Sequence, residues 1–294
     1  MRILFLTAEL EPVLSFSRVG EVAAGLARGL KNLGHDIRII APRFTSISPR
    51  RHALRDITRL SQFPIHFADK SFTVKVRSYS LLPSRAPVYY LDEPFHFGSD
   101  PYEPDARTNM NFSERFGFFA YAALQIVRQL DWRPEVVHCC GTPTLITPLL
   151  MRREELLAPF YSSTKVVLHL PEGEIHRDWG SIDPSLWGWR FIGEERDRVW
   201  NITQEAMRWA DGVVANGSSG TLPTPWRSQY GWLEGVDLNQ NEFLNSPLEK
   251  KLLEPEDVAE FKKNNRNRLA ELVGHPDIAQ QPIGVLWLKG CEQS

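Results

Sequence analysis

The first 41 residues constrain the fold most, because their pattern predicts a strand, a loop, a helix and a second strand. Residues 3–8 form an apolar run broken by one threonine, which is typical of a strand covered on both faces of a parallel sheet. Ile37, Ile39 and Ile40 form a second apolar strand that ends at Pro42. Parallel strands need a crossover connection, usually a helix, so the sequence opens with a βαβ unit.

The connection between these strands predicts an amphipathic helix preceded by a loop. Apolar side chains recur at spacings of four, four and three residues, at Val22, Leu26, Leu30 and Leu33. They form one stripe on a helix, and Gly34 follows where a left-handed residue commonly ends a helix. Residues 9–20 then lie at the carboxyl edge of the sheet, where open parallel sheets bind ligands. We therefore expect the binding site at this loop.

The rest of the chain predicts short strands followed by a renewed alternation of strands and helices. The expected strands are 58–67, 72–82, 88–91, 136–139, 165–170, 212–215 and 283–288, and the expected helices are 111–130, 144–155, 198–209 and 256–273. Strands that alternate with helices favour a parallel sheet with helices on both faces. The predicted fold class is α/β, a Rossmann-like doubly wound parallel sheet with extra short β-strands.

Charge and cysteine content exclude several functional classes. The net charge is −2 and no basic tract reaches five residues, so neither nucleic acid nor an anionic membrane is an expected partner. The opening apolar run has six residues, too few for a signal peptide or a membrane span. Cys139 and Cys140 are adjacent and Cys291 is distant, which suits neither a disulfide framework nor a CxxC metal site. A reducing, cytoplasmic location is expected.

The common catalytic motifs are missing from the sequence. It has no GxxxxGK[ST], no GxGxxG after the first strand, no GxSxG and no HExxH. Glu172 and Glu174 stand beside His176 and Asp178, which invites a metal or paired-carboxylate interpretation. Ligands on one loop without a distant partner make a weak site, so an acidic loop is favoured and no metal is expected.

Tryptophan is concentrated in one region. Seven of the nine tryptophans lie between Trp179 and Trp232. Core packing uses such side chains, and so do surfaces that bind sugars or proteins. Both interpretations of this cluster stay open.

Several motifs, in their order along the chain, carry a family resemblance. They are Ala8, Glu9 and Pro12, then Glu21-Val22, LGHDIRIIAPRF at 33–44, Pro101-Tyr102, PEVVH at 134–138, VLH at 167–169, ADGVVANGSS at 210–219 and EGVD at 234–237. This set resembles the amino-terminal half of bacterial glycogen synthase and plant starch synthase. The resemblance implies the amino-terminal lobe of a GT-B fold in residues 1–250. It implies a linker helix and the first strand of a truncated second lobe in residues 251–294.

The resemblance also implies candidate site residues. Glu9 and Tyr102 match residues that face the acceptor glucan in the family, and His169 matches a histidine near the transferred glucose. His138 ends a strand beside them, and Arg18 is a candidate for attracting a phosphate. Structural roles compete with four of these: Glu9 as a cap or a partner of Arg18, Tyr102 as an anchor of its loop, His138 as a packed core residue, and Arg18 as a solvated loop arginine.

Other positions depart from the family pattern. Ser15 stands where the family has a lysine, Ser17 and Arg18 where it has two glycines, Gly141 where it has an aspartate, and Leu170 where it has an asparagine. Lysine and glycine at those loop positions let a backbone approach and bind a diphosphate. Their loss favours a protein that no longer transfers glucose.

Three functions stay open on the sequence. The leading hypothesis is a non-catalytic binding or assembly subunit, whose partner is an α-glucan or a protein, or a second copy bound through the face left by the missing lobe. The first alternative is an ADP-glucose:α-glucan glucosyltransferase completed by a lobe from another chain, and only this alternative requires ADP-glucose. The second is a structural subunit of a larger complex with no sugar role. No other cofactor is expected.

Overall fold

The computed structural model describes residues 1–100, 102, 111–171, 179–183, 187–192, 199–215 and 267. The chain divides into two compact units, Met1–Gly235 and Val236–Ser294, and the description below concerns the first. The predicted domain boundary at residue 250 and the predicted strand 283–288 lie outside the described residues. So does the predicted helix 256–273, except for Asn267, which is helical.

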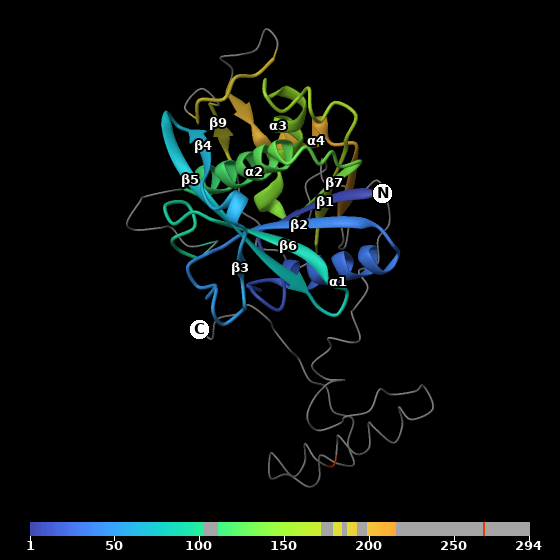
Figure 1. Ribbon diagram of the computed structural model, residues 1–294. Helices are drawn as coiled ribbons and strands as arrows, with labels where there is room; N and C mark the ends of the chain where they lie inside the picture. The colour runs from blue at the N-terminus through green and yellow to red at the C-terminus, as the bar shows by residue number, and fades with distance from the viewer. Residues whose placement is uncertain are drawn as a thin grey trace. The chain divides into compact units, whose positions relative to one another are not determined.

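The first unit alternates strands and helices, as the sequence predicts (Figure 1). In chain order the elements are β1 (Arg2–Thr7), α1 (Arg18–Asn32), β2 (Asp36–Pro42), β3 (Arg55–Asp56), the 3-10 helix η1 (Thr58–Leu60), β4 (Phe63–Phe67), β5 (Lys70–Leu81), β6 (Ala86–Asp92), α2 (Phe112–Gln129), β7 (Val136–Cys140), the 3-10 helix η2 (Thr142–Thr144), α3 (Thr147–Arg153), β8 (Lys165–Leu170), β9 (Ser181–Ile182), β10 (Trp200–Asn201), α4 (Ile202–Trp209) and β11 (Gly212–Ala215).

Nine of the described strands form one sheet, in the order β11-β8-β7-β1-β2-β6-β5-β3, with β4 paired to β5. The six strands from β11 to β6 pair in parallel, which confirms the predicted Rossmann-like α/β sheet. The extra strands β3, β4 and β5 pair antiparallel and extend the β6 side. The sheet is therefore mixed, with its antiparallel strands at one edge.

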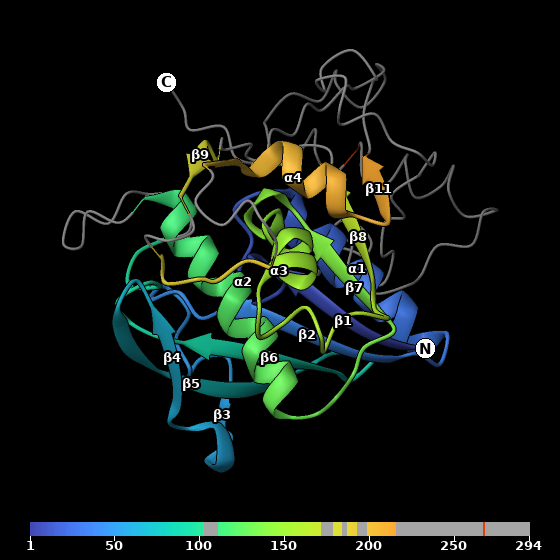
Figure 2. The same cartoon turned by 90° about the horizontal axis from the view of Figure 1, so that it is seen from above.

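Helices cover both faces of this sheet. Figures 1 and 2 show α1 on one face and α2, α3 and α4 on the other. The apolar side chains of β1 alternate accordingly, because Phe5 packs in the core beneath α1 while Leu4 and Leu6 pack in the larger core with α2. Gly34 follows α1 with a φ of 83°, the left-handed conformation predicted for it.

Four of the clustered tryptophans belong to the core. Trp179, Trp187, Trp189 and Trp200 are all buried, and they pack in the same apolar cluster as α2. The core interpretation of the cluster is therefore correct for these four residues. Trp226 and Trp232 lie outside the described residues.

Three of the described elements have a boundary that differs from the sequence prediction by more than two residues. The predicted strand 58–67 begins with a 3-10 turn, and β4 starts only at Phe63. The predicted helix 144–155 is a 3-10 turn followed by α3, whose first turn contains Pro148, because a proline is tolerated where a helix begins but not inside it. The predicted helix 198–209 starts at Ile202, since the Asn201 side chain accepts the Gln204 N–H as a cap.

None of the helices that the structure describes combines the length and the apolarity that crossing a bilayer requires.

Candidate functional site

The loop between β1 and α1 is built around the carboxylate of Glu9. This side chain is completely buried. Its Oε2 accepts the backbone N–H groups of Phe16 at 2.6 Å and Ser17 at 2.8 Å, and its Oε1 accepts the Ser17 hydroxyl at 2.9 Å. Hydrogen bonds to a carboxylate are among the stronger ones in proteins. The predicted ligand-binding loop therefore holds an anion that belongs to the chain itself.

Tyr102 joins this site from a position 93 residues away. Its hydroxyl donates to Oε1 of Glu9 at 2.6 Å. Its ring lies edge-on to the ring of Phe16, with 6.4 Å between the ring centroids, and both rings are partly exposed. The structure thus brings together the two residues that the resemblance assigns to the glucan.

The loop also covers the start of α1. The Ser17 hydroxyl caps the helix by accepting the Val19 N–H at 3.2 Å, and Arg18 is the first helical residue. A Cβ atom at Gly20 would lie 2.8 Å from Oγ of Ser15 and 3.0 Å from the carbonyl oxygen of Leu14. The chain therefore packs directly onto the first helical turn, where an anionic ligand would otherwise approach the helix amino terminus.

This close packing leads to a test with an internal control. We expect Gly20→Ala to lower the free energy of unfolding by about 1–2 kcal/mol, because the new methyl group overpacks the loop. Nothing lies within 4 Å of a Cβ atom at Gly29 of the same helix, so Gly29→Ala should raise that free energy by up to ~1 kcal/mol. Urea denaturation followed by circular dichroism measures both. Equal effects of the two substitutions would show that the loop does not rest on the helix.

His138 and His169 also lie together, on the neighbouring strands β7 and β8. Nε2 of His138 is 3.3 Å from Nδ1 of His169, and the His138 ring stacks on Phe5 with the centroids 4.7 Å apart. Burial, with a further contribution from His169, lowers the pKa of His138 to about 3. The imidazole is therefore neutral at physiological pH and donates or accepts one hydrogen bond within the pair.

The turn after β7 explains one departure from the family pattern. Gly141 has a φ of 89°, a left-handed conformation that glycine adopts without strain. Its N–H donates to the His169 carbonyl at 2.8 Å. Trp179 closes the turn by donating from Nε1 to the Thr142 carbonyl at 2.8 Å. A tightly packed glycine turn thus occupies the position where the family carries a carboxylate.

The adjacent cysteines have a packing role. Cys139 and Cys140 are both buried thiols, and burial raises the pKa of the Cys139 thiol to about 12. The nucleophilic thiolate is therefore strongly disfavoured at Cys139. Within the described part of the chain, no three His, Cys, Asp or Glu side chains are placed to hold a metal ion. The acidic segment Glu172 to Asp178 lies outside that part.

The sequence reasoning missed the residues that bind Glu9 within the loop. Ser17 carried a signal, because a serine directly before an apolar-periodic segment is a common helix cap. Phe16 carried none, since it contributes a backbone N–H and a partly exposed ring, neither of which a motif records.

Comparison with known proteins places these features in a family context. Residues 2–209 match the family model of the starch synthase catalytic domain. The glycogen synthase of Chlorobium limicola is 24% identical over 311 residues, covering 96% of this chain and 62% of that protein. The glycogen synthase of Geotalea uraniireducens is 32% identical over 168 residues, covering 57% of this chain and 34% of that protein. The chain thus spans at most about three fifths of these two relatives.

A solved structure supports the fold. The catalytic domain of starch synthase IV from Arabidopsis thaliana, bound to ADP and acarbose, matches with a TM-score of 0.71 and 20% sequence identity. The match covers 93% of this chain and 59% of that one. At this identity the similarity concerns the fold, and it confirms the predicted Rossmann-like lobe of a GT-B architecture.

Proposed function

Since the chain belongs to the family of starch synthase catalytic domains, we propose that it is a non-catalytic member that binds an α-glucan at the carboxyl edge of its sheet. The proposal separates two ligands that the Arabidopsis relative holds together, ADP and acarbose. The nucleotide site is lost and the glucan site is kept. A cytoplasmic location stays a prediction from the cysteine content.

The observation that carries the proposal is the occupied loop. Backbone N–H groups at the amino end of a helix bind phosphates in many folds. Here the N–H groups of Phe16 and Ser17 donate to Glu9, and that of Val19 donates to Ser17. A diphosphate would have to displace a buried carboxylate of the same charge. The serines at 15 and 17 also remove the charge and the backbone freedom associated with phosphate binding.

The glucan part of the proposal rests on Tyr102 and Phe16. Their partly exposed rings lie edge-on beside the fixed Glu9 carboxylate, and aromatic rings with a polar end suit the apolar faces and hydroxyls of a sugar. His169 is 1% exposed, and its carbonyl already accepts the Gly141 N–H. We therefore assign His169 and His138 to positioning the turn, and not to direct contact with the glucan.

Co-sedimentation with glycogen tests the proposal on the full chain. The wild type should pellet with glycogen, and acarbose should release it. Tyr102→Ala should weaken the binding about 10-fold, because it removes a stacking ring and the donor to Glu9. Tyr79→Ala, which changes a partly exposed tyrosine of β5, is the matched control and should bind normally. Absence of pelleting, together with a stoichiometric protein in a pull-down, would support a structural subunit without a sugar role.

A second candidate is a transferase completed in trans. Two polar pairs at the carboxyl edge favour it. Glu9 and Tyr102 form one pair and His138 and His169 form the other, so the four residues that the resemblance selects lie close to one another in pairs. Binding of a protein partner, or of a second copy of the chain, is a prediction of this candidate as well. The transfer assay described in the Discussion separates it from the leading proposal.

A further inference from the structure

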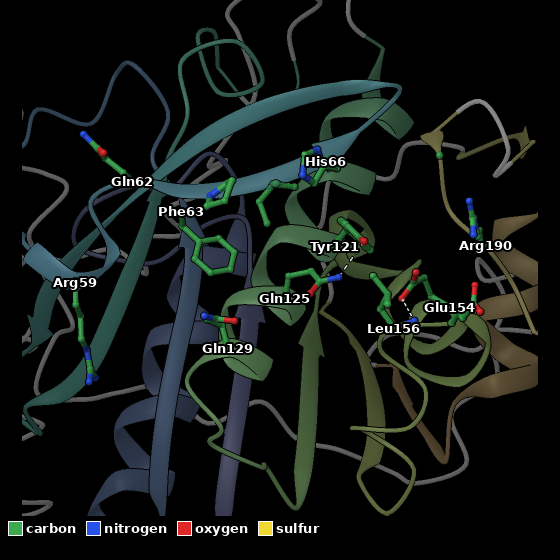
Figure 3. Close-up of a pocket in the computed structure, with 14 residues that line it drawn as sticks. Arg59, Gln62, Phe63, His66, Tyr121, Gln125, Gln129, Glu154, Leu156 and Arg190 are labelled. Atoms are coloured by element: carbon green, nitrogen blue, oxygen red, sulfur yellow. Dashed lines mark hydrogen bonds between the residues drawn. The ribbon is translucent and has the colours of Figure 1, made fainter.

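A cavity lies between β4, α2 and the segment that follows α3 (Figure 3). Its volume is about 640 Å³, within the range of roughly 300–1,000 Å³ that is typical of small-molecule sites. Neither polar pair of the carboxyl edge contributes to its described lining. This cavity is therefore separate from the site proposed above.

The cavity wall contains three polar side chains that are more than nine-tenths buried. Tyr121, Gln125 and Glu154 are 6%, 8% and 2% exposed. Gln125 Nε2 donates to the Tyr121 hydroxyl at 2.9 Å, which leaves the phenolic hydrogen available to a ligand. Oε2 of Glu154 accepts the N–H groups of Leu156 and Leu157, both at 2.9 Å, so this carboxyl group is fixed in place. Oε1 of Gln125 accepts from Nη1 of Arg128 at 3.3 Å, so the protein itself satisfies these buried groups and holds their remaining donor and acceptor positions in fixed directions.

This wall carries little charge near neutral pH. Burial raises the pKa of Glu154 to about 7. Burial and the neighbouring Glu154 raise the pKa of Tyr121 to about 12. An amide, a phenol and a half-protonated carboxyl group can each donate and accept hydrogen bonds. The hydroxyl groups of an uncharged ligand can do the same, so they suit this wall.

The rim of the cavity does not favour an anion. Arg59 and Arg190 both line it, but Figure 3 shows them at opposite ends, where they do not converge on one group. Phe63 and Gln129 lie between them, beside Gln125 (Figure 3). An aromatic ring next to amide groups offers a stacking surface together with directional hydrogen bonds.

Among the described strands β4 pairs only with β5, and its other edge does not favour an added peptide strand. β4 pairs with β5, and its register places Pro64 opposite Thr73. Proline has no N–H to donate, and prolines on edge strands block pairing with another chain. A small ligand fits the cavity better than an extended peptide does.

We propose that this cavity binds a neutral polyhydroxylated ligand, a sugar of two or three rings, at a site separate from the carboxyl edge. The Tyr121 hydroxyl, the Gln125 amide and the Glu154 carboxyl group bind its hydroxyls, and Phe63 packs against its apolar face. The inference goes beyond the proposed function and does not depend on it.

Calorimetric titration with maltotriose tests the inference. The full chain carrying Tyr102→Ala is the background, because this substitution weakens the carboxyl-edge site. Maltotriose should still bind once per chain. Gln125→Met should weaken that binding about 10-fold, as expected for roughly 1.4 kcal/mol of lost hydrogen bonding, and Gln129→Ala, at an exposed position, should weaken it about 3-fold. Gln204→Ala is the matched control, since it removes an exposed helix glutamine of α4 and should change nothing.

The outcomes distinguish the possible ligands. Absence of saturable binding in the Tyr102→Ala background would overturn the inference, and so would binding that neither glutamine variant weakens. Saturable binding of inorganic phosphate that Arg59→Ala or Arg190→Ala abolishes would overturn it in favour of an anion site. If Gln125→Met fails to fold by circular dichroism, Gln129→Ala decides. If the cavity does not bind maltotriose, the Tyr102-dependent pelleting with glycogen is still expected, so the two proposals are tested separately.

Discussion

Replacing Glu9 with alanine should lower the free energy of unfolding by about 3–5 kcal/mol, the range found when one partner of a buried charged network is removed. The carboxylate accepts four hydrogen bonds, from the N–H groups of Phe16 and Ser17 and from the hydroxyls of Ser17 and Tyr102. Each buried donor left without an acceptor costs about 1–3 kcal/mol. Relaxation of the loop toward solvent reduces the sum.

Urea denaturation followed by tryptophan fluorescence measures this loss. Glu21→Ala is the control, because Glu21 is a partly exposed acid in the first turn of α1 and contributes only about 0.3–1 kcal/mol through the helix dipole. Glu9→Gln should fall between the two, since it keeps the shape of the side chain but turns one acceptor into a donor. A loss below ~1 kcal/mol for Glu9→Ala would mean that the carboxylate does not hold the loop together.

The opening βαβ unit was predictable because its signals are local. Apolar runs specify β1 and β2, and Val22, Leu26 and Leu30 together with Gly34 specify α1. Leu33, which was expected on the same stripe, is instead the exposed carboxyl-terminal cap of the helix. The boundaries of α3 and α4 were less predictable, because they depend on Pro148 and Asn201, single residues inside segments that have helical periodicity throughout. The missed strands β3, β9 and β10 have two residues each, too few to produce any pattern.

Candidate site residues could be selected from the sequence, but their contacts could not. The resemblance selected Glu9, Tyr102, His138 and His169, and the structure places them as two close pairs. The resemblance did not reveal that Glu9 binds its own loop, because that arrangement depends on the backbone N–H groups of Phe16 and Ser17. Backbone groups have no sequence signature, so only the folded loop reveals whether its anion site is occupied.

The cavity between β4 and α2 has only a weak signal in the sequence. Tyr121 and Gln125 stand four residues apart on α2, within a stretch of that helix, 116–127, that is otherwise apolar. Residues at that spacing share a helix face, which marks a polar patch in a buried surface. Glu154 reaches the same cavity from a segment 29 positions further along the chain, and no local pattern predicts this meeting.

The second large effect that we expect is a loss of glucosyl transfer activity. Glucosyl transfer from ADP-glucose requires a held donor and stabilisation of the diphosphate as it leaves. Removing one such stabilising group typically costs about 10²–10³ in rate. This chain has Ser15 in place of the family lysine, and its loop N–H groups bind Glu9. We therefore expect transfer at least ~10³-fold slower than in a family member with an intact loop.

Transfer of labelled glucose from ADP-glucose to glycogen tests the central claim most directly. The purified full chain is compared with the glycogen synthase of Chlorobium limicola under identical conditions, and co-sedimentation confirms that the chain binds the acceptor. We predict that incorporation of labelled glucose stays at the background level while the chain still pellets with glycogen. Sustained incorporation over many turnovers, by the chain alone or with a co-purifying partner, would contradict it.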